Sequence, residues 1–229
     1  MRKGKGTEMA VTEKLKNTKA HQVYRLSDGT VAPGVTTVLN ILAKPALVPW
    51  ANRLGLEGID VRSYVDKLAS IGTLAHYMVE CDLKDEEPDL SAYSPEEINL
   101  AENCLIKYWG WKEKNKPKPI LIEAQLVSNK WRFGGTIDLY CEIDNELWLV
   151  DLKTGKAIYP EMITQLSAYT MLLKENGYPT KKVQILRIGR SEDEGFEVNE
   201  KSLTQLKPHW EKFKHCLEIY RLDKEIRGN

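Results

Sequence analysis

The sequence predicts a mixed α/β (α+β) fold, in which helices flank a central sheet of mixed strand direction. Helical patterns fill the first half of the chain, and three short strands separated only by turns follow, which is typical of an antiparallel meander. A helix then separates this meander from one or two further strands, and such a crossover connects parallel neighbours in a sheet. The two kinds of connection together predict a mixed sheet.

Each element has its own sequence signal. Residues 22–31 alternate around Ser27-Asp28-Gly29, as expected for a small hairpin. The clearest helix start combines Ser, Pro and Glu at 94, 95 and 97, which predicts an N-cap, a first helical residue and a capping box. Helices are expected over 36–43 (resumed over 50–54 after Pro45 and Pro49), within 58–82, and over 94–114, 159–177 and 201–227; strands are expected over 119–127, 131–143, 146–153, 182–190 and 195–198.

A hairpin within the meander brings two aspartates together. Centring its turn between Asp144 and Asn145 places Asp138 opposite Asp151, with Cβ atoms about 5 Å apart. Lys153 lies two residues beyond Asp151 and therefore points to the same face. Like charges opposite one another destabilise a sheet unless a positive charge lies between them. The hairpin therefore predicts a divalent-cation site beside an ammonium group.

The preceding strand contributes a third carboxylate. If the turn after this strand is centred between Asn129 and Lys130, Glu123 opposes Thr136 and lies one diagonal step from Asp138. An alternative is a set of exposed acids on a solvated sheet face, which is common in antiparallel sheets. A continuous apolar run, Leu-Trp-Leu-Val, precedes the downstream aspartate and favours a functional site, because a charge at the end of a buried strand needs a partner.

Composition sets the wider limits. The 229 residues include 33 Lys and Arg and 33 Asp and Glu, so no net charge attracts the chain as a whole to nucleic acid. No apolar run could span a bilayer, and no secretory signal follows the basic N-terminus, so we expect a cytoplasmic protein. We expect a disordered basic tail at 1–20 and a single domain at 21–229, with a helical part at 36–115, a sheet and crossover helix at 119–190, and a C-terminal helix at 201–227.

Two helices carry polar pairs on one face. Gln165 and Tyr169 are i,i+4 neighbours on the helix that follows the second aspartate, and His76 and Glu80 have the same spacing on an earlier helix. Taken alone, each pair is more often an ordinary helix edge or a packing residue than a site. Near the carboxylates, Gln165 could contact substrate, and His76 becomes a candidate metal ligand through its neutral imidazole.

Four motifs, in this order, resemble those of the PD-(D/E)XK nuclease superfamily, and in particular its RecB-like exonuclease branch of phages and bacteria. They are Gly-Thr-Leu-Ala-His at 72–76, Gly-Gly-Thr-Ile-Asp at 134–138, Asp-Leu-Lys at 151–153 and Gln-Leu-Ser-Ala-Tyr at 165–169. The resemblance implies a restriction-endonuclease-like core with an N-terminal helical elaboration, which cuts DNA with one or two Mg²⁺ or Mn²⁺ ions. Iron–sulfur members have cysteines clustered near the C-terminus, whereas this chain has Cys216 alone there and no CxxC pair, so we expect no iron–sulfur cluster.

The resemblance also implies a role for each residue. The catalytic residues would be Glu123, Asp138, Asp151 and Lys153; the metal ligands would be His76, Asp138, Asp151 and the backbone carbonyl of Leu152; and the substrate-binding residues would be Gln165 and Tyr169. Oxygen-rich ligation suits Mg²⁺ or Mn²⁺. Lys153 would orient or help to deprotonate the attacking water, and Glu123 would support the ligands or bind a second ion.

Several functions are compatible with these motifs. The expected one is a metal-dependent DNA exonuclease that acts on single-stranded or duplex ends in phage or bacterial recombination, repair or DNA processing, with a recombination protein as a further candidate partner. The alternatives are an inactive nuclease-fold DNA-binding subunit, a structure-specific endonuclease, and a metal-dependent phosphodiesterase on another fold. The intact Asp138, Asp151 and Lys153 disfavour the inactive subunit. Polarity, RNA as a substrate and oligomeric state stay open.

Basic and aromatic residues offer a path for a nucleic-acid strand. The candidates for phosphate contacts are Lys112, Lys114, Lys116 and Lys118, together with Lys181, Lys182, Arg187 and Arg190, and the candidates for base stacking are Trp109, Trp111 and Trp131. Each set has an ordinary alternative, because lysine runs are usually solvated and most tryptophans are buried.

Overall fold

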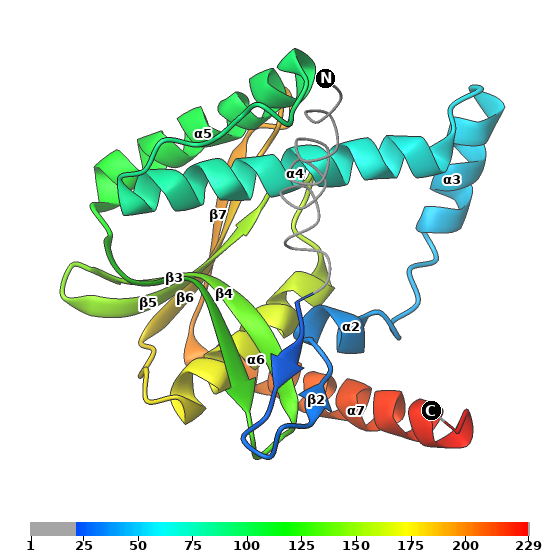
Figure 1. The fold of residues 1–229 in the computed structure, drawn as a ribbon, viewed down its shortest axis with the longest axis vertical. Helices are drawn as coiled ribbons and strands as arrows, with labels where there is room; N and C mark the ends of the chain where they lie inside the picture. The colour runs from blue at the N-terminus through cyan, green and yellow to red at the C-terminus, as the bar shows by residue number, and fades with distance from the viewer. Residues whose placement is uncertain (1–21, 229) are drawn as a thin grey trace, which may run out of the picture.

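The computed structural model describes residues 22–228 and has a five-stranded sheet at its centre (Figure 1). The strands are β3 (Lys118–Ser128), β4 (Phe133–Ile143), β5 (Glu146–Lys153), β6 (Lys182–Ile188) and β7 (Phe196–Lys201), in the spatial order β3-β4-β5-β6-β7. Strands β5 and β6 pair in parallel, and the other neighbours pair antiparallel. The predicted mixed sheet is confirmed. The tail predicted at 1–20 lies outside the described residues.

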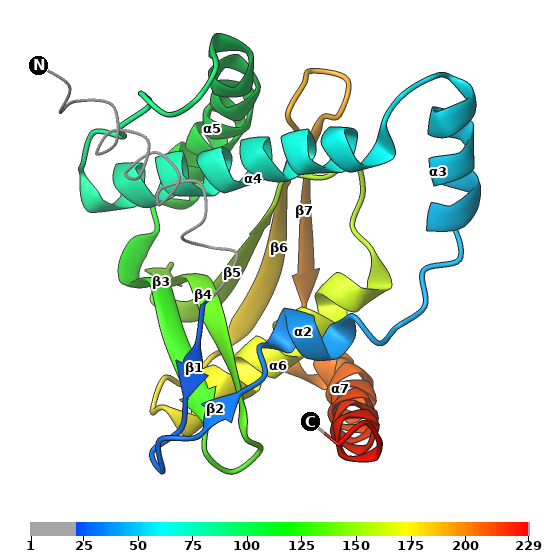
Figure 2. The same cartoon turned by 45° about the vertical axis from the view of Figure 1, so that its right-hand side comes forward.

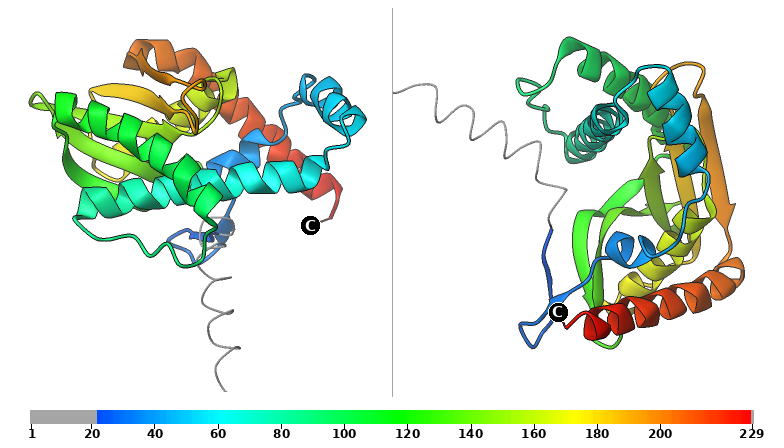
Figure 3. Two further views of the ribbon diagram at one scale, coloured as in Figure 1. Left: turned by 90° about the horizontal axis from the view of Figure 1, so that it is seen from above. Right: turned by 90° about the vertical axis from the view of Figure 1, so that its right-hand side faces the viewer.

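Helices cover both faces of the sheet (Figure 3). On one face lie α2 (Val35–Leu39), α6 (Pro160–Glu175) and α7 (Leu203–Ile226), and on the other lie α4 (Val61–Lys84) and α5 (Pro95–Asn115). Helix α3 (Leu47–Leu56) buries none of its residues and stands beside the first turns of α4 (Figure 2). The hairpin of β1 (Tyr24–Arg25) and β2 (Val31–Ala32) lies against β3 and β4. Within residues 22–228, no helix combines the length and apolarity needed to cross a membrane.

Each face of the sheet has its own hydrophobic core. The α6-side core lies beneath α2, α6 and α7 and includes Leu149 and Ile185, whereas the α4-side core lies beneath α4 and α5 and includes Val150 and Leu186. Consecutive residues of β5 and β6 thus contribute to opposite cores, which explains the continuous apolar runs in their sequences. Each fully buried aliphatic side chain contributes about 1.5–3 kcal/mol, so both helical layers are held firmly on the sheet.

Several element boundaries differ from the prediction, three of them for a clear reason or by several residues. Helix α2 ends at Leu39, earlier than expected. Pro49 does not interrupt a helix, because it is the third residue of α3, where a backbone N–H has no intrahelical partner to lose. Strand β7 extends to Lys201 because it pairs with β6 along its whole length. The predicted capping box of α5 is present, since the Ser94 hydroxyl accepts a hydrogen bond from the N–H of Glu97.

The β4–β5 turn has the predicted register. Asp144 and Asn145 have φ angles of 50° and 62°, as expected for a two-residue hairpin turn, and Leu139 lies opposite Val150.

The β3–β4 turn is longer than predicted. It occupies residues 129–132, with Arg132 at a φ of 52°. Thr136 therefore pairs with Gln125, and the predicted pairing of Thr136 with Glu123 is wrong. This two-residue shift brings Glu123 level with Asp138 instead of one diagonal step away.

Candidate active site

The regular alternation of β3 and β4 breaks at Glu123 and Asp138. Ile122 and Leu139 pair with each other and pack in the α4-side core, whereas Ile137 packs in the α6-side core. Residues two apart on a strand normally share a face, so β4 changes its facing at Asp138. Glu123 has a φ of 48°, outside the extended region, which marks the same irregularity in β3. The two acids therefore lie where the strands pass from one core to the other.

Asp138 also connects β4 to β5 through its side chain. The ladder between these strands ends at the pair of Leu139 and Val150, one step before the predicted pair of Asp138 and Asp151. Beyond that point, the Asp138 Oδ2 atom accepts a hydrogen bond of 2.8 Å from the N–H of Leu152. The Asp138 carboxylate thus accepts the hydrogen bond that a backbone carbonyl of β4 would accept in a continuous ladder. It thereby fixes the backbone next to Asp151.

Helix α4 brings His76 to the two acids. The His76 Nδ1 atom lies 3.6 Å from Asp138 Oδ1 and 3.7 Å from Glu123 Oε1. One ligand atom from each of these three residues lies within 4.8 Å of the others. Gly72 allows this close approach, because a methyl group there would lie only 2.8 Å from the hydroxyl oxygen of Thr154, just after β5.

Asp151 and Lys153 form a buried ion pair at the end of β5. The Lys153 Nζ atom lies 2.5 Å from Asp151 Oδ2, and Asp151 is 1% exposed. Burial raises the pKa of the Asp151 carboxyl to about 6, with Lys153 opposing the shift and Asp138 adding to it. Burial lowers the pKa of Lys153, but the attraction of Asp151 and Asp138 outweighs this effect and raises it above its usual value. The pair is therefore held in its charged form at neutral pH.

The polar pair of α6 lies beside the same acids. The Gln165 amide donates a hydrogen bond of 2.7 Å to the hydroxyl of Tyr169. Burial, and then the negative charges of Asp151 and Asp138, raise the pKa of Tyr169 well above its usual value, so this hydroxyl stays protonated. Tyr169 reaches the sheet because Gly135 has no side chain: a methyl group there would lie 2.6 Å from its ring.

A pocket of about 350 Å³ collects most of these side chains. Its lining contains His76, Glu123, Asp138, Lys153, Gln165 and Tyr169 from the predicted set. Asp151 and Leu152 are not part of the lining and lie deeper, under 5% exposed. Six of the predicted residues therefore line the pocket, and Asp151 and Leu152 lie beneath its lining. The ion pair of Asp151 with Lys153 connects the buried residues to the pocket.

Sequence reasoning missed the wall of the pocket that the N-terminal segment forms. Gln22, Tyr24 of β1 and Thr36 of α2 line it, together with Thr136 of β4. The Tyr24 and Thr136 hydroxyls are 3.0 Å apart, and Tyr24 lies where a methyl group on Gly134 would contact it at 2.4 Å. The adjacent glycines at 134 and 135 could have indicated that other side chains pack closely on this strand. Gly134 makes room for the ring of Tyr24, and Gly135 makes room for the ring of Tyr169.

The predicted nucleic-acid path is only partly available. Arg187 and Arg190 are each 7% exposed and Trp111 is 4% exposed, so these three residues are not surface contacts, contrary to the expectation. Arg187 and Arg190 are instead bound to Glu197 and Glu194. Trp109 is exposed and donates a hydrogen bond to Asp82.

The donor set fits a divalent cation. Two carboxylates and an imidazole converge, and both oxygens of the buried Asp151 lack a directed hydrogen bond within residues 22–228. Buried anionic oxygen atoms are costly without a positive partner, and Lys153 supplies a single positive charge. Carboxylate oxygen with imidazole nitrogen suits Mn²⁺, and the carboxylates alone suit Mg²⁺.

Comparisons with known proteins identify a family for this chain. The family model of the PD-(D/E)XK nuclease superfamily matches residues 51–218, a range that contains every predicted site residue. Among solved structures, the chain is similar to SSO0001 (14% identity, covering 92% of this chain and 85% of that one, TM-score 0.37), to a protein from Eubacterium rectale described as a candidate exonuclease (8%, 69% and 68%, 0.49), and to an alkaline exonuclease from Laribacter hongkongensis (10%, 67% and 84%, 0.36). No curated protein matches. Because these structural likenesses are weak, the assignment rests on the family model: the chain belongs to the PD-(D/E)XK nuclease superfamily.

Proposed function

We propose that this protein is a divalent-metal-dependent DNA exonuclease. The observation that carries the proposal is the convergence of Glu123, Asp138 and His76 in one pocket with the ammonium of Lys153. Such a site combines ligands for a cation with a positive group beside the position of a phosphate, which is the arrangement that phosphodiester hydrolysis needs. Trimming of DNA ends in recombination, repair or processing is the role we propose for it.

The metal ligands that we propose are His76, Glu123 and Asp138, with Asp151 and the Leu152 carbonyl as additional ligands. When bound, Mg²⁺ or Mn²⁺ would make water a stronger acid and offset the negative charge of the scissile phosphate. The inclusion of Glu123 as a direct ligand extends the family-based assignment, and it is supported by the 4.8 Å grouping with His76 and Asp138.

The protein's own residues would then position the reacting groups. Lys153 lines the pocket and offers its ammonium hydrogens to the attacking water or to a phosphate oxygen. Asp151 keeps this ammonium charged and in place through the 2.5 Å ion pair. Tyr169 remains protonated and, with Gln165, presents hydrogen-bond donors to the nucleotide.

The pocket is compatible with an exonuclease. At about 350 Å³, it is within the size range of ligand sites and could accept a terminal nucleotide. The N-terminal residues Gln22 and Tyr24 bound it on one side, and the α4 residues Ala69 and Thr73 bound it on another.

A single assay tests this function. Labelled DNA, single- or double-stranded and linear or circular, is incubated with the protein and Mg²⁺, Mn²⁺ or EDTA, with RNA as a further substrate. We expect metal-dependent release of nucleotides from linear DNA and no cutting of circles. Cutting of circles would indicate an endonuclease, and the absence of cutting in every condition would favour an inactive DNA-binding subunit.

Metal binding is expected to depend on the clustered acids. Isothermal titration with Mn²⁺ should show binding that weakens by about 10-fold or more in Asp138→Asn, because this variant loses a ligand and alters the support of Leu152. Glu142→Gln is the matched control, since Glu142 is also on β4 but pairs with Lys118 at the far end of the hairpin. Equal Mn²⁺ affinity in Asp138→Asn and wild type would contradict the proposed ligand set.

A further inference from the structure

Arg187 lies beside the proposed catalytic lysine. In the parallel pairing of β5 and β6, Arg187 is the partner of Lys153, and the pairing ends there. The Arg187 side chain is 9% exposed and is not among the residues that line the pocket. Arg187 is therefore adjacent to the pocket but is not placed to contact a substrate in it.

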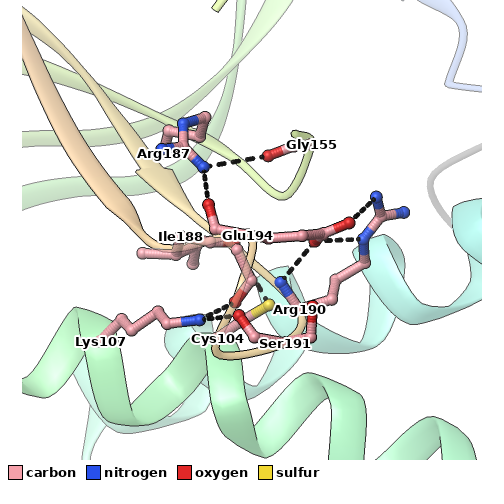
Figure 4. A network of polar contacts seen from close by, with 9 residues as sticks. Cys104, Lys107, Gly155, Arg187, Ile188, Arg190, Ser191 and Glu194 are labelled. Carbon is pink, nitrogen blue, oxygen red and sulfur yellow. Dashed lines mark hydrogen bonds and ion pairs between the residues drawn. The ribbon is translucent and has the colours of Figure 1, made fainter. Parts of the chain in front are cut away.

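The guanidinium of Arg187 joins three segments, and Figure 4 shows its contacts with two of them, at Gly155 and Glu194. Its Nε atom donates to the Glu197 carboxylate on β7 at 3.1 Å. Its Nη1 atom donates to the backbone carbonyl of Gly155 at 3.4 Å and to that of Glu194. Because guanidinium is planar, with donors in fixed directions, one arginine can make these contacts at once, whereas a lysine ammonium cannot reproduce their geometry.

The β6–β7 turn is a firm anchor for this contact. The side chains of Arg190 and Glu194 are 9% and 8% exposed in it, and three hydrogen bonds join the two residues, at 2.8, 2.9 and 3.1 Å. Lys107 of α5 donates to the carbonyls of Gly189, at 2.8 Å, and Ser191, at 2.5 Å. These two hydrogen bonds attach the turn to α5, which belongs to the helical layer on the α4 side of the sheet. The Glu194 carbonyl therefore has a defined position.

The second segment that Arg187 binds, which contains Gly155, comes directly after the Asp-Leu-Lys motif at 151–153. Residues 154–159 connect Lys153 to α6, and they have no regular secondary structure. The Arg187 guanidinium supplies a side-chain hydrogen bond to this segment, at the carbonyl of Gly155. Thr154 also packs against Gly72 of α4. Arg187 is therefore well placed to set the path of the chain as it leaves Lys153.

We propose that Arg187 is a positioning residue, whose contact with Gly155 holds the segment after Lys153 and so keeps the Lys153 ammonium at Asp151. The proposal rests on the nuclease function proposed above. It replaces the expectation that Arg187 contacts phosphate, because a buried guanidinium with these partners faces the protein interior.

Kinetics with two matched variants test the proposal. In Arg187→Lys, kcat should fall by about 10- to 100-fold with little change in KM, since a small displacement of a catalytic group has effects of this size. Arg221→Lys is the control, because Arg221 on α7 also donates to a backbone carbonyl, that of Trp131, but contacts neither residues 154–159 nor the β6–β7 turn. It should keep the wild-type kcat. Guanidinium ion, at a concentration far below denaturing, should restore part of the activity of Arg187→Ala.

Hydrogen exchange gives a readout that does not need activity. Amides of residues 154–159 should exchange faster in Arg187→Lys than in wild type, and at the wild-type rate in Arg221→Lys. Equal losses of kcat in the two variants, or unchanged exchange in Arg187→Lys, would overturn the proposal. A wild-type protein that cuts no nucleic acid would overturn the proposed function instead, while the exchange experiment would still decide whether Arg187 holds this segment.

Discussion

Replacement of Lys153 by methionine is expected to reduce DNA cleavage strongly and to lower the stability of the protein. Loss of a preorganised positive group beside the phosphate costs about 10²–10³-fold in rate. The same change leaves Asp151, which is 1% exposed, without its ionic partner. Breaking a buried pair from one side costs about 3–5 kcal/mol. Rates of nucleotide release and urea unfolding followed by circular dichroism measure the two effects.

A double variant separates catalysis from stability. In Asp151→Asn/Lys153→Met neither partner is charged, so most of the stability lost in Lys153→Met should return, because the uncompensated buried charge is gone. Activity should stay as low as in Lys153→Met, since the ammonium is still missing. Wild-type cleavage by Lys153→Met, or recovery of activity in the double variant, would rule out the proposed role of Lys153.

Replacement of Gly135 by alanine is expected to damage both the fold and the site. The added methyl group would lie 2.6 Å from Cε1 of Tyr169 and 3.0 Å from Cδ1 of Leu172. Overpacking of this kind costs about 1–3 kcal/mol, and relief of the clash requires α6 or the Tyr169 ring to move. We expect a lower urea midpoint and a reduced cleavage rate, because Tyr169 and its partner Gln165 line the pocket.

Two comparisons make this prediction specific. Gly110→Ala, on α5, adds a methyl group with no atom within 4 Å, so the helix should be stabilised by up to about 1 kcal/mol. In a Tyr169→Ala background, the Gly135→Ala change should lose most of its cost, because the main contact has been removed. A full cost in that background would show that the glycine is needed for another reason.

The meander could be predicted from sequence because its signals are local. Asp144 and Asn145 tolerate positive φ angles and fix a two-residue turn, which sets the register of β4 against β5. The length of the β3–β4 turn was not predicted by the same reasoning, because Arg132 adopts a φ of 52°. Glycine or asparagine usually occupies such a position, and here neither residue marks it in the sequence. The register that this turn sets depended on packing elsewhere in the fold.

The acids of the site were predictable, but their arrangement was not. Strand alternation brought Glu123, Asp138 and Asp151 to one region, and the motifs added His76. Alternation assumes uniform strands, and it could not foresee the change of facing at Glu123 and Asp138 or the position of Asp151 beneath the pocket. The contribution of Tyr24 depends on a contact between distant segments, which periodicity does not describe.

The crossing of β4 from one core to the other has a consequence for how such an enzyme can be altered. His76 is carried by a helix of the α4-side core, whereas Gln165 and Tyr169 are carried by a helix of the α6-side core. Substitutions within one core can therefore adjust the proposed metal-ligand side of the pocket, while the other core preserves the side proposed to bind the nucleotide. If these roles hold, metal preference and substrate preference can diverge separately within a single fold, with Asp138 in an unchanged position between them.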